Sequence, residues 1–176
     1  SAYSFPSLLG FLEMYRVGKI EQLNIANRWG TSLPIATLEV PVGVDRTGNL
    51  FKLDLHEKFH GPHGLVAGTT GSGKSEFLIT YILSMAINYH PYEVSFVLID
   101  YKGGGLAGAF ENKITKVKLP HLAGTITNLD VNDMNRSLAS IQSELKKRQK
   151  LFNIAREKLN EGTIDIYKYQ KLYREG

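Results

Sequence analysis

The chain has 176 residues, no cysteine and a formal net charge of +4. This length suits one domain with an appendage, and the lack of cysteine excludes disulfides, thiolate zinc sites and cysteine nucleophiles. A composition of 43% hydrophobic and 22% charged residues excludes a mostly disordered chain. The small positive charge permits nucleic-acid binding without establishing it, and residues 77–87, the longest apolar-rich stretch, fall short of the roughly 18 residues of a membrane span.

The first third of the chain predicts short helices followed by a β-hairpin. Apolar residues recur at helical spacing over residues 6–29, which indicates two short helices, the second ending at Gly30. Residues 38–45 and 50–54 alternate apolar and polar side chains around the turn 46–49.

Strands and helices then alternate. We expect a short buried strand at residues 65–67, a helix at 74–89, an apolar strand at 94–99 and a further strand at 121–127. A continuous apolar run such as 94–99 is typical of a strand that is buried on both faces. Strands that alternate with helices predict a parallel sheet with right-handed crossovers, so the fold class is α/β.

The last part of the chain predicts a long helix at residues 130–160 and a short helix at 164–173. An apolar stripe with steps of three and four supports the long helix; it consists of Met134, Leu138, Ile141, Leu145, Phe152, Ala155 and Leu159. The charged run 144–150 is interpreted as a solvated helix face with pairs such as Glu144 and Arg148.

One stretch carries a chemical signature, because residues 68–75 match the phosphate-binding pattern G-x-x-x-x-G-K-[ST] in full. An apolar run precedes this loop and an amphipathic helix follows it, which is the setting that the pattern requires. The eight residues are Gly68, Thr69, Thr70, Gly71, Ser72, Gly73, Lys74 and Ser75.

The residue types of this loop suit the phosphates of ATP and a magnesium ion. Glycine lets the backbone fold tightly and bring N–H groups to the phosphate oxygens, and the following helix adds the positive end of its dipole. Lys74 supplies a charge for the β and γ phosphates, and Ser75 supplies a hydroxyl ligand for Mg²⁺.

Asp100 is the candidate catalytic residue, and three interpretations of it stay open. It ends an apolar strand, as does the Mg²⁺-binding Asp of a Walker B element, but Tyr101 follows it where motor ATPases often carry Glu. It is otherwise a motif residue at the carboxyl edge of the sheet, or part of a plain turn before the glycines at 103–105. No apolar strand ends in Asp-Glu, so we expect the chain to be truncated before its catalytic machinery is complete.

Several stretches resemble the FtsK/SpoIIIE ATPases, and specifically the EssC/EccC (YukB-like) branch that serves type VII secretion. The resemblance covers nearly the whole chain. It rests on LGFLEMYRVGKIEQLNIANRW at 9–29, GPHGLVAGTTGSGKSE at 61–76, FVLIDYKGGG at 96–105, LPHLAGTITNLD at 119–130 and IDIYKYQKLYREG at 164–176.

This resemblance implies a RecA-like P-loop fold, ATP with Mg²⁺ as cofactors, and the first of several ATPase modules. It also implies a place at the cytoplasmic face of the plasma membrane and the export of small helical WXG-type proteins. The implied partners are other ATPase modules of the same chain, neighbouring subunits and a membrane secretion complex; DNA is not expected. In such proteins the Walker B strand lies past Gly176.

Residues 1–60 are accordingly predicted to form a helical and hairpin segment, and residues 61–176 the N-terminal part of the P-loop ATPase domain. Two other functions remain open beside a secretion motor. One is a DNA translocase, because the family includes DNA pumps; the other is a nucleotide-binding regulatory module without hydrolysis.

Overall fold

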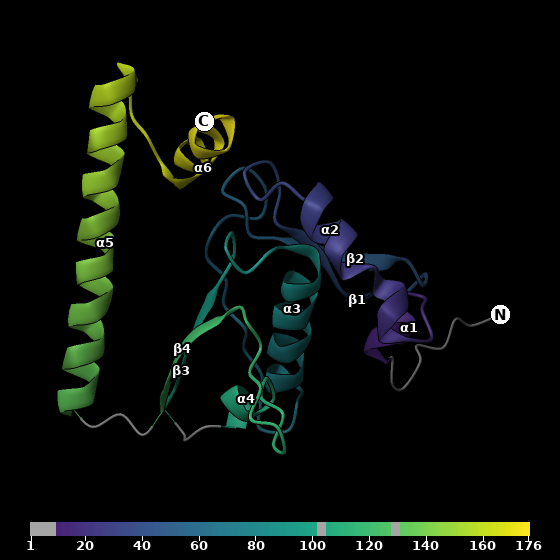
Figure 1. Cartoon of the computed structure of the whole chain (residues 1–176). Helices are drawn as coiled ribbons and strands as arrows, with labels where there is room; N and C mark the ends of the chain where they lie inside the picture. The colour runs from purple at the N-terminus through teal and green to yellow at the C-terminus, as the bar shows by residue number, and fades with distance from the viewer. Residues whose placement is uncertain (1–9, 102–104, 128–130) are drawn as a thin grey trace. The chain divides into compact units, whose positions relative to one another are not determined.

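A computed structural model describes residues 10–101, 105–127 and 131–176 (Figure 1). The described residues fall into two compact units. The first comprises the described part of Ser1–Phe96 together with Ala109–Ala123, and the second comprises the described parts of Val97–Gly108 and Gly124–Gly176. The predicted α/β class is confirmed, because helices accompany a parallel pair of strands.

The first unit begins with three short helical segments, where the sequence predicted two. They are α1 (Phe11–Met14), the 3₁₀ turn η1 (Ile20–Leu23) and α2 (Ile25–Thr31). Gly30 does not end α2, because the backbone N–H of Ser32 still donates to the carbonyl of Arg28 at 2.9 Å. The Thr31 hydroxyl also donates to the carbonyl of Asn27, which extends the helix by one residue.

The predicted β-hairpin is confirmed, with β1 (Glu39–Val44) antiparallel to β2 (Leu50–Asp54). One carboxylate oxygen of Asp45 accepts the backbone N–H groups of Thr47 and Asn49, at 2.8 and 3.0 Å. Gly48 adopts a φ of +83°, which glycine reaches without steric cost. The hydrogen bonds of Asp45 and the backbone angle of Gly48, all within residues 45–49, therefore set the register of the two strands.

Helix α3 (Lys74–Asn88) packs its C-terminal half against this hairpin. Val40 of β1, Met85 of α3 and Tyr89 form the centre of the core, with Val42 and Phe96 packed around them. Full burial of a side chain such as that of Met85 contributes about 1.5–3 kcal/mol.

The predicted strand at residues 65–67 is wrong. These residues form no strand, and the side chains of Leu65 and Val66 are 94% and 41% exposed. Among the described residues, one sheet pairs β1 with β2 and the other pairs β3 (Phe96–Asp100) with β4 (Leu122–Thr127). No strand of either sheet is hydrogen-bonded to residues 65–67. A strand exists only as part of a hydrogen-bonded ladder, and an apolar run without a partner stays irregular.

The parallel pair consists of β3 (Phe96–Asp100) and β4 (Leu122–Thr127), and the short helix α4 (Gly105–Gly108) follows β3. Strand β3 begins two residues later than predicted. The N–H groups of Glu93 and Val94 donate to the carbonyl of His90, at 2.9 and 3.0 Å. These residues form a turn, so the strand begins only after it.

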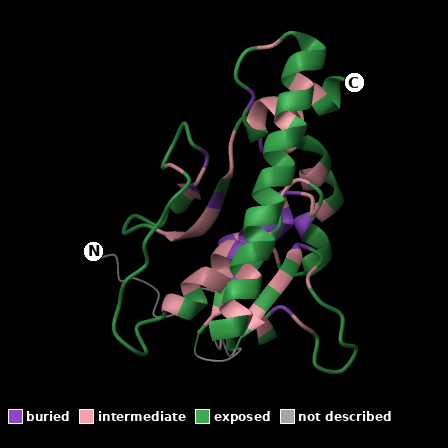
Figure 2. Cartoon of the chain, turned by 90° about the vertical axis from the view of Figure 1, so that its left-hand side faces the viewer, coloured by how far each residue is buried: buried purple, intermediate pink, exposed green. Residues whose placement is uncertain are grey.

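Two helices end the second unit, α5 (Val131–Leu159) and α6 (Ile166–Glu175), and both predictions are confirmed. Phe152 contacts the ring of Tyr169 with 5.3 Å between centroids, and the Asp165 side chain caps α6 by accepting the Lys168 N–H. No residue of α5 is buried, as Figure 2 shows. Within the described ranges, no helix combines the length and the apolar character that crossing a membrane requires.

Candidate phosphate-binding site

The loop that precedes α3 has the backbone conformation of a tight phosphate cradle. Gly71 and Gly73 have φ angles of +82° and +97°, in the left-handed region that other residues rarely adopt. Gly73 is also the N-cap of α3, and its carbonyl accepts the N–H of Phe77 at 2.9 Å. Two of the three glycines of the loop are thus required by backbone geometry.

The third glycine, Gly68, lies close to two side chains of the same loop. A Cβ atom built at Gly68 would overlap the hydroxyl oxygen of Ser72 and lie 3.4 Å from Cγ of Lys74. The loop therefore closes on itself at Gly68, and the N–H of Ser72 bonds the carbonyl of Thr69 at 3.1 Å. Thr69 and Thr70 span this closure and are exposed.

The ammonium group of Lys74 folds back over the loop. Its Nζ donates to the carbonyl oxygens of Gly68 and Thr69, the latter at 3.0 Å. Phosphate oxygens are anionic and make stronger hydrogen bonds with an ammonium group than neutral carbonyls do. The same side chain can therefore exchange these contacts for phosphate contacts.

The residues present fit a nucleotide phosphate chain with its magnesium ion. Residues 68–73 are exposed, and the first N–H groups of α3 have no partner within the helix, so they supply donors at the positive end of the dipole. Lys74 adds a cation, and the exposed hydroxyl of Ser75 is an oxygen ligand of the kind that Mg²⁺ prefers.

A chain of polar contacts holds the helix that carries this loop, and sequence reasoning missed it. Ser84 is fully buried and donates to the carbonyl of Pro41 in β1 at 2.6 Å, so the Tyr15 hydroxyl donates to Ser84 at 2.6 Å. Asn88 in turn donates to Tyr15 at 3.0 Å. Trp29 of α2 donates to the carbonyl of Ala86 at 2.8 Å. Contacts across 57 and 69 residues leave no local signal in the sequence.

Asp100 ends β3 as expected and is half-buried. It belongs to the second unit, whereas residues 68–75 belong to the first. Gly103 and Gly104 lie outside the described residues, and Gly105 begins α4. The role of Asp100 therefore stays a prediction.

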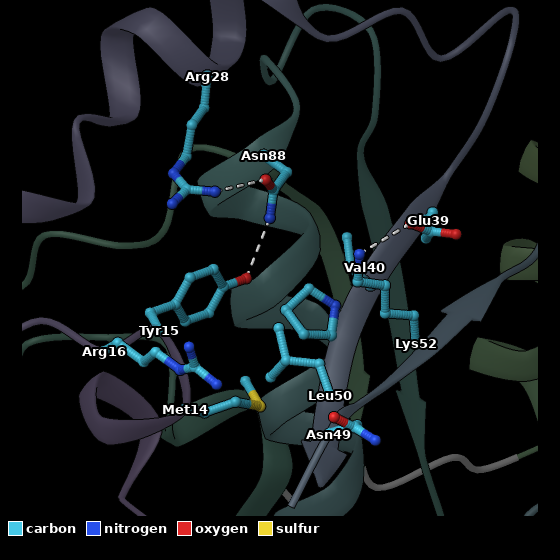
Figure 3. A pocket seen from close by; sticks show the side chains of 11 residues that line it. Met14, Tyr15, Arg16, Arg28, Glu39, Val40, Asn49, Leu50, Lys52 and Asn88 are labelled. Atoms are coloured by element: carbon cyan, nitrogen blue, oxygen red, sulfur yellow. Dashed lines mark hydrogen bonds and ion pairs between the residues drawn. The ribbon is translucent and has the colours of Figure 1, made fainter.

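A cavity of about 620 Å³ lies elsewhere in the first unit (Figure 3), and no residue of the 68–75 loop lines it. The loop itself is an open surface cradle. The loop's donors and backbone angles make it the candidate phosphate site, because a phosphate chain is bound by surface N–H groups and needs no deep cavity.

Comparison with known proteins relates this geometry to one family. The pattern of the FtsK/SpoIIIE family matches residues 24–171. The chain is 51% identical, over 98% of its length, to the type VII secretion system protein EssC of Staphylococcus aureus. It is 50% identical over 98% of its length to the ESX secretion system protein YukB of Bacillus subtilis, and it spans 11% of each of these relatives.

Solved structures agree on the fold. The cytoplasmic domain of the type VII secretion ATPase EccC of Thermomonospora curvata superposes with a TM-score of 0.79 at 31% identity, covering 97% of this chain and 19% of that one. A structure of EccC ATPases 2 and 3 in complex with a signal sequence peptide gives a TM-score of 0.59 at 30% identity, covering 79% of this chain and 23% of that one.

Proposed function

Because this chain belongs to the FtsK/SpoIIIE family, we propose that it is the ATP-binding part of a motor ATPase that drives type VII secretion. The observation that carries the proposal is the cradle at residues 68–75, with left-handed Gly71 and Gly73 at the start of α3. The 51% identity to EssC supports secretion over other uses of the fold.

Each residue of the cradle has a role in this proposal. Backbone N–H groups of Gly68, Thr69, Thr70, Gly71, Ser72 and Gly73 surround the phosphates. Lys74 neutralises the β and γ phosphates, and Ser75 holds Mg²⁺. Bound ATP supplies the γ-phosphoryl group, and the protein supplies positioning and charge.

The relatives support a proposal about the longer protein in which this chain works. The chain spans about a tenth of EssC and YukB, and we propose that it is the first ATPase module, working with other modules of the same chain and with neighbouring subunits. In this proposal residues 1–60 form a helical and hairpin segment ahead of the ATPase part at 61–176. The module acts at the cytoplasmic face of the plasma membrane, within a membrane secretion complex.

Small helical WXG-type proteins are the proposed cargo. The signal sequence peptide in complex with EccC ATPases 2 and 3 supports a secreted protein as the partner of this kind of motor. DNA is not proposed as a ligand. The exposed run at residues 144–150 includes an internal pair, with Nε of Arg148 2.9 Å from a carboxylate oxygen of Glu144, as predicted for a solvated helix face.

The test of this function is export by cells whose parent protein carries Lys74→Ala. We expect release of the small secreted proteins into the medium to fall at least tenfold, with the parent protein present at its normal level. Lys58→Ala, an exposed lysine outside the cradle, is the control and leaves export unchanged. Normal export with Lys74→Ala would contradict a motor role and favour a regulatory module.

Hydrolysis by the chain alone is the second proposal, and we infer that it is absent. A general base must lie within hydrogen-bond reach of the attacking water, and Asp100 is followed by Tyr101 and not by Glu. Phosphate release from Mg-ATP by the purified chain should stay at background, and a longer piece of the parent should restore it. Turnover near 1 s⁻¹ that Lys74→Ala abolishes would overturn this inference and direct attention to Asp100.

A further inference from the structure

A closed loop lies between α4 and β4 in the chain, at residues 111–118. An antiparallel bridge joins Glu111 to Lys118 at its base. Just outside the bridge, the N–H of Leu119 donates to the carbonyl of Phe110 at 2.9 Å, and the side chain of Phe110 is buried, at 6% exposure. The buried ring and the backbone bonds therefore fix the base of the 111–118 loop in the first unit, to which the loop belongs.

The tip of the loop is ordered by hydrogen bonds that lie within it. The side-chain oxygen of Asn112 accepts the backbone N–H groups of Ile114 and Thr115, at 2.9 and 3.1 Å. The carbonyl of Asn112 accepts the N–H of Lys116 at 2.8 Å, and the N–H of Asn112 donates to the carbonyl of Val117 at 2.8 Å. These backbone donors of the tip are thus satisfied without a partner outside the loop.

The tip presents two branched aliphatic side chains to water. Every residue from 112 to 118 is exposed, and the exposed fractions of Ile114 and Val117 are 92% and 65%. Branched aliphatic residues favour strands that are at least half-buried, and water does not favour their apolar surface. An apolar phase that covers the tip would therefore stabilise the bound loop.

Three lysines surround these aliphatic residues, and they lack counter-charges. Lys113, Lys116 and Lys118 form no ion pair with a carboxylate in the described part of the chain. Glu111, at the base, is the only acidic residue between positions 109 and 121. The loop therefore combines an apolar tip with an excess of positive charge.

A lipid bilayer with anionic headgroups fits this combination. Aliphatic side chains enter the boundary between headgroups and acyl chains, while lysine ammonium groups stay with the headgroup phosphates. Entry into an apolar phase also requires hydrogen-bonded backbone groups, and Asn112 supplies these bonds at the tip. Nucleic acid would account for the lysines but not for the two aliphatic residues, because its phosphate backbone offers them no apolar surface.

We propose that the 111–118 loop is a membrane contact. Its two aliphatic side chains enter the interfacial region of an anionic bilayer, and its three lysines bind the headgroups. Stable anchoring needs more than one such signal, so the loop orients the module on a membrane and does not anchor it alone. The proposal goes beyond the motor function and does not require that residues 68–75 bind ATP.

The test is co-sedimentation of the chain with vesicles of equal parts phosphatidylcholine and phosphatidylglycerol. We expect the chain to sediment with these vesicles and to stay in solution with phosphatidylcholine alone. Each lysine at an anionic surface strengthens binding roughly fivefold, so the loss of all three should weaken it about tenfold or more. The test variant is Lys113→Gln/Lys116→Gln/Lys118→Gln. The control Lys146→Gln/Lys147→Gln/Lys150→Gln, which removes the same charge from the exposed run of α5, should leave binding unchanged.

A second pair of variants tests the apolar part of the contact at constant charge. Ile114→Ser/Val117→Ser should weaken binding to the anionic vesicles by about threefold or more, because it removes the apolar surface that the bilayer covers. Ile20→Ser changes an aliphatic residue that is 63% exposed in η1, outside the loop, and should leave binding unchanged.

Insertion of the tip can be observed directly, because the chain has no cysteine and a single introduced one is labelled uniquely. A nitrobenzoxadiazole label at Ile114→Cys should gain intensity and shift to shorter wavelength with anionic vesicles. The same label at Ser143→Cys, an exposed position of α5, should not change. Absence of co-sedimentation, equal losses from the two triple-lysine variants, or an unchanged label at position 114 would overturn the proposal and favour an acidic protein as the partner of the loop.

Discussion

Gly68 is the loop residue at which a side chain has least room. A Cβ atom there would overlap the Ser72 hydroxyl oxygen unless that side chain turned away, whereas a Cβ atom at Gly64 would meet no other atom within 4 Å. We therefore expect Gly68→Ala to weaken Mg-ATP binding about tenfold and Gly64→Ala to leave it unchanged. Both affinities come from the same calorimetric titration, and equal effects of the two variants would show that the closure at Gly68 is unimportant.

His121 makes the first unit sensitive to acid. Its side chain is 1% exposed, and its Nε2 donates to the carbonyl of Tyr89 at 2.6 Å. Its Nδ1 has no hydrogen-bond partner within the described part of the chain. Burial lowers the pKa of His121 below its usual 6.5.

The unfolded chain therefore binds a proton at His121 more readily than the folded chain does, and the free energy of unfolding falls as the pH drops below about 6.5. We expect the urea midpoint to be lower at pH 5 than at pH 7.5. His121→Gln should remove this part of the pH dependence, and the exposed control His63→Gln should retain it. An identical pH dependence in wild type and His121→Gln would contradict the assignment.

Asp54 joins the hairpin to the segments on either side of it. Its carboxylate accepts the Thr37 hydroxyl at 2.5 Å and the backbone N–H groups of Leu38 and His56 at 2.9 and 3.0 Å. Burial alone would raise the pKa of Asp54, but these hydrogen bonds outweigh burial and the pKa is lowered. The last residue of β2 thus fixes both the start of β1 and the loop after β2.

Asp54→Asn should lower the free energy of unfolding by about 1–3 kcal/mol, because an amide cannot replace both carboxylate oxygens as acceptors. Glu39→Gln, at an ion pair that is about half exposed, is the control and should change it by less than about 1 kcal/mol. Urea unfolding monitored by the single tryptophan, Trp29, measures both. Similar losses in the two variants would argue against Asp54 as a structural link.

Local signals account for the elements that the sequence predicted. The 46–49 turn, the start of α3 at Lys74 and the long helix α5 depend on residues within a few positions of one another. Residues 65–67 were wrongly predicted as a strand. A strand needs a second strand to hydrogen-bond with, and the sequence of three apolar residues does not show whether such a strand is present. The apolar residues of α5, spaced three and four apart, predicted the helix. This spacing does not show which part of the protein the helix packs against.

In the candidate site, too, the local features could be predicted from the sequence and the long-range contacts could not. The pattern at residues 68–75 follows from backbone angles and donor chemistry, and its glycines are found where the geometry requires them. The hydrogen bonds from Tyr15 to Ser84 and from Ser84 to Pro41, which hold α3, join residues that are far apart in the chain. Such contacts depend on the fold and could not be predicted from spacing.

At the scale of the whole molecule, the candidate residues for binding and for chemistry are divided between the two compact units. The cradle lies in the first unit and Asp100 in the second. In the proposed function, nucleotide binding depends on residues 68–75, on α3 and on the hydrogen bonds that hold α3, all of which lie in the first unit. The account therefore predicts that nucleotide affinity and nucleotide turnover are separable properties of this chain.

The most direct measurement is calorimetric titration of Mg-ATP into the wild-type chain, Lys74→Ala and the control Lys58→Ala. Lys74→Ala removes charge-assisted hydrogen bonds worth about 1.5–3 kcal/mol, so we predict a loss of affinity of roughly 10- to 150-fold. Lys58→Ala should bind as the wild type does. Equal affinity of the wild type and Lys74→Ala would contradict the central claim that residues 68–75 bind the phosphates of ATP.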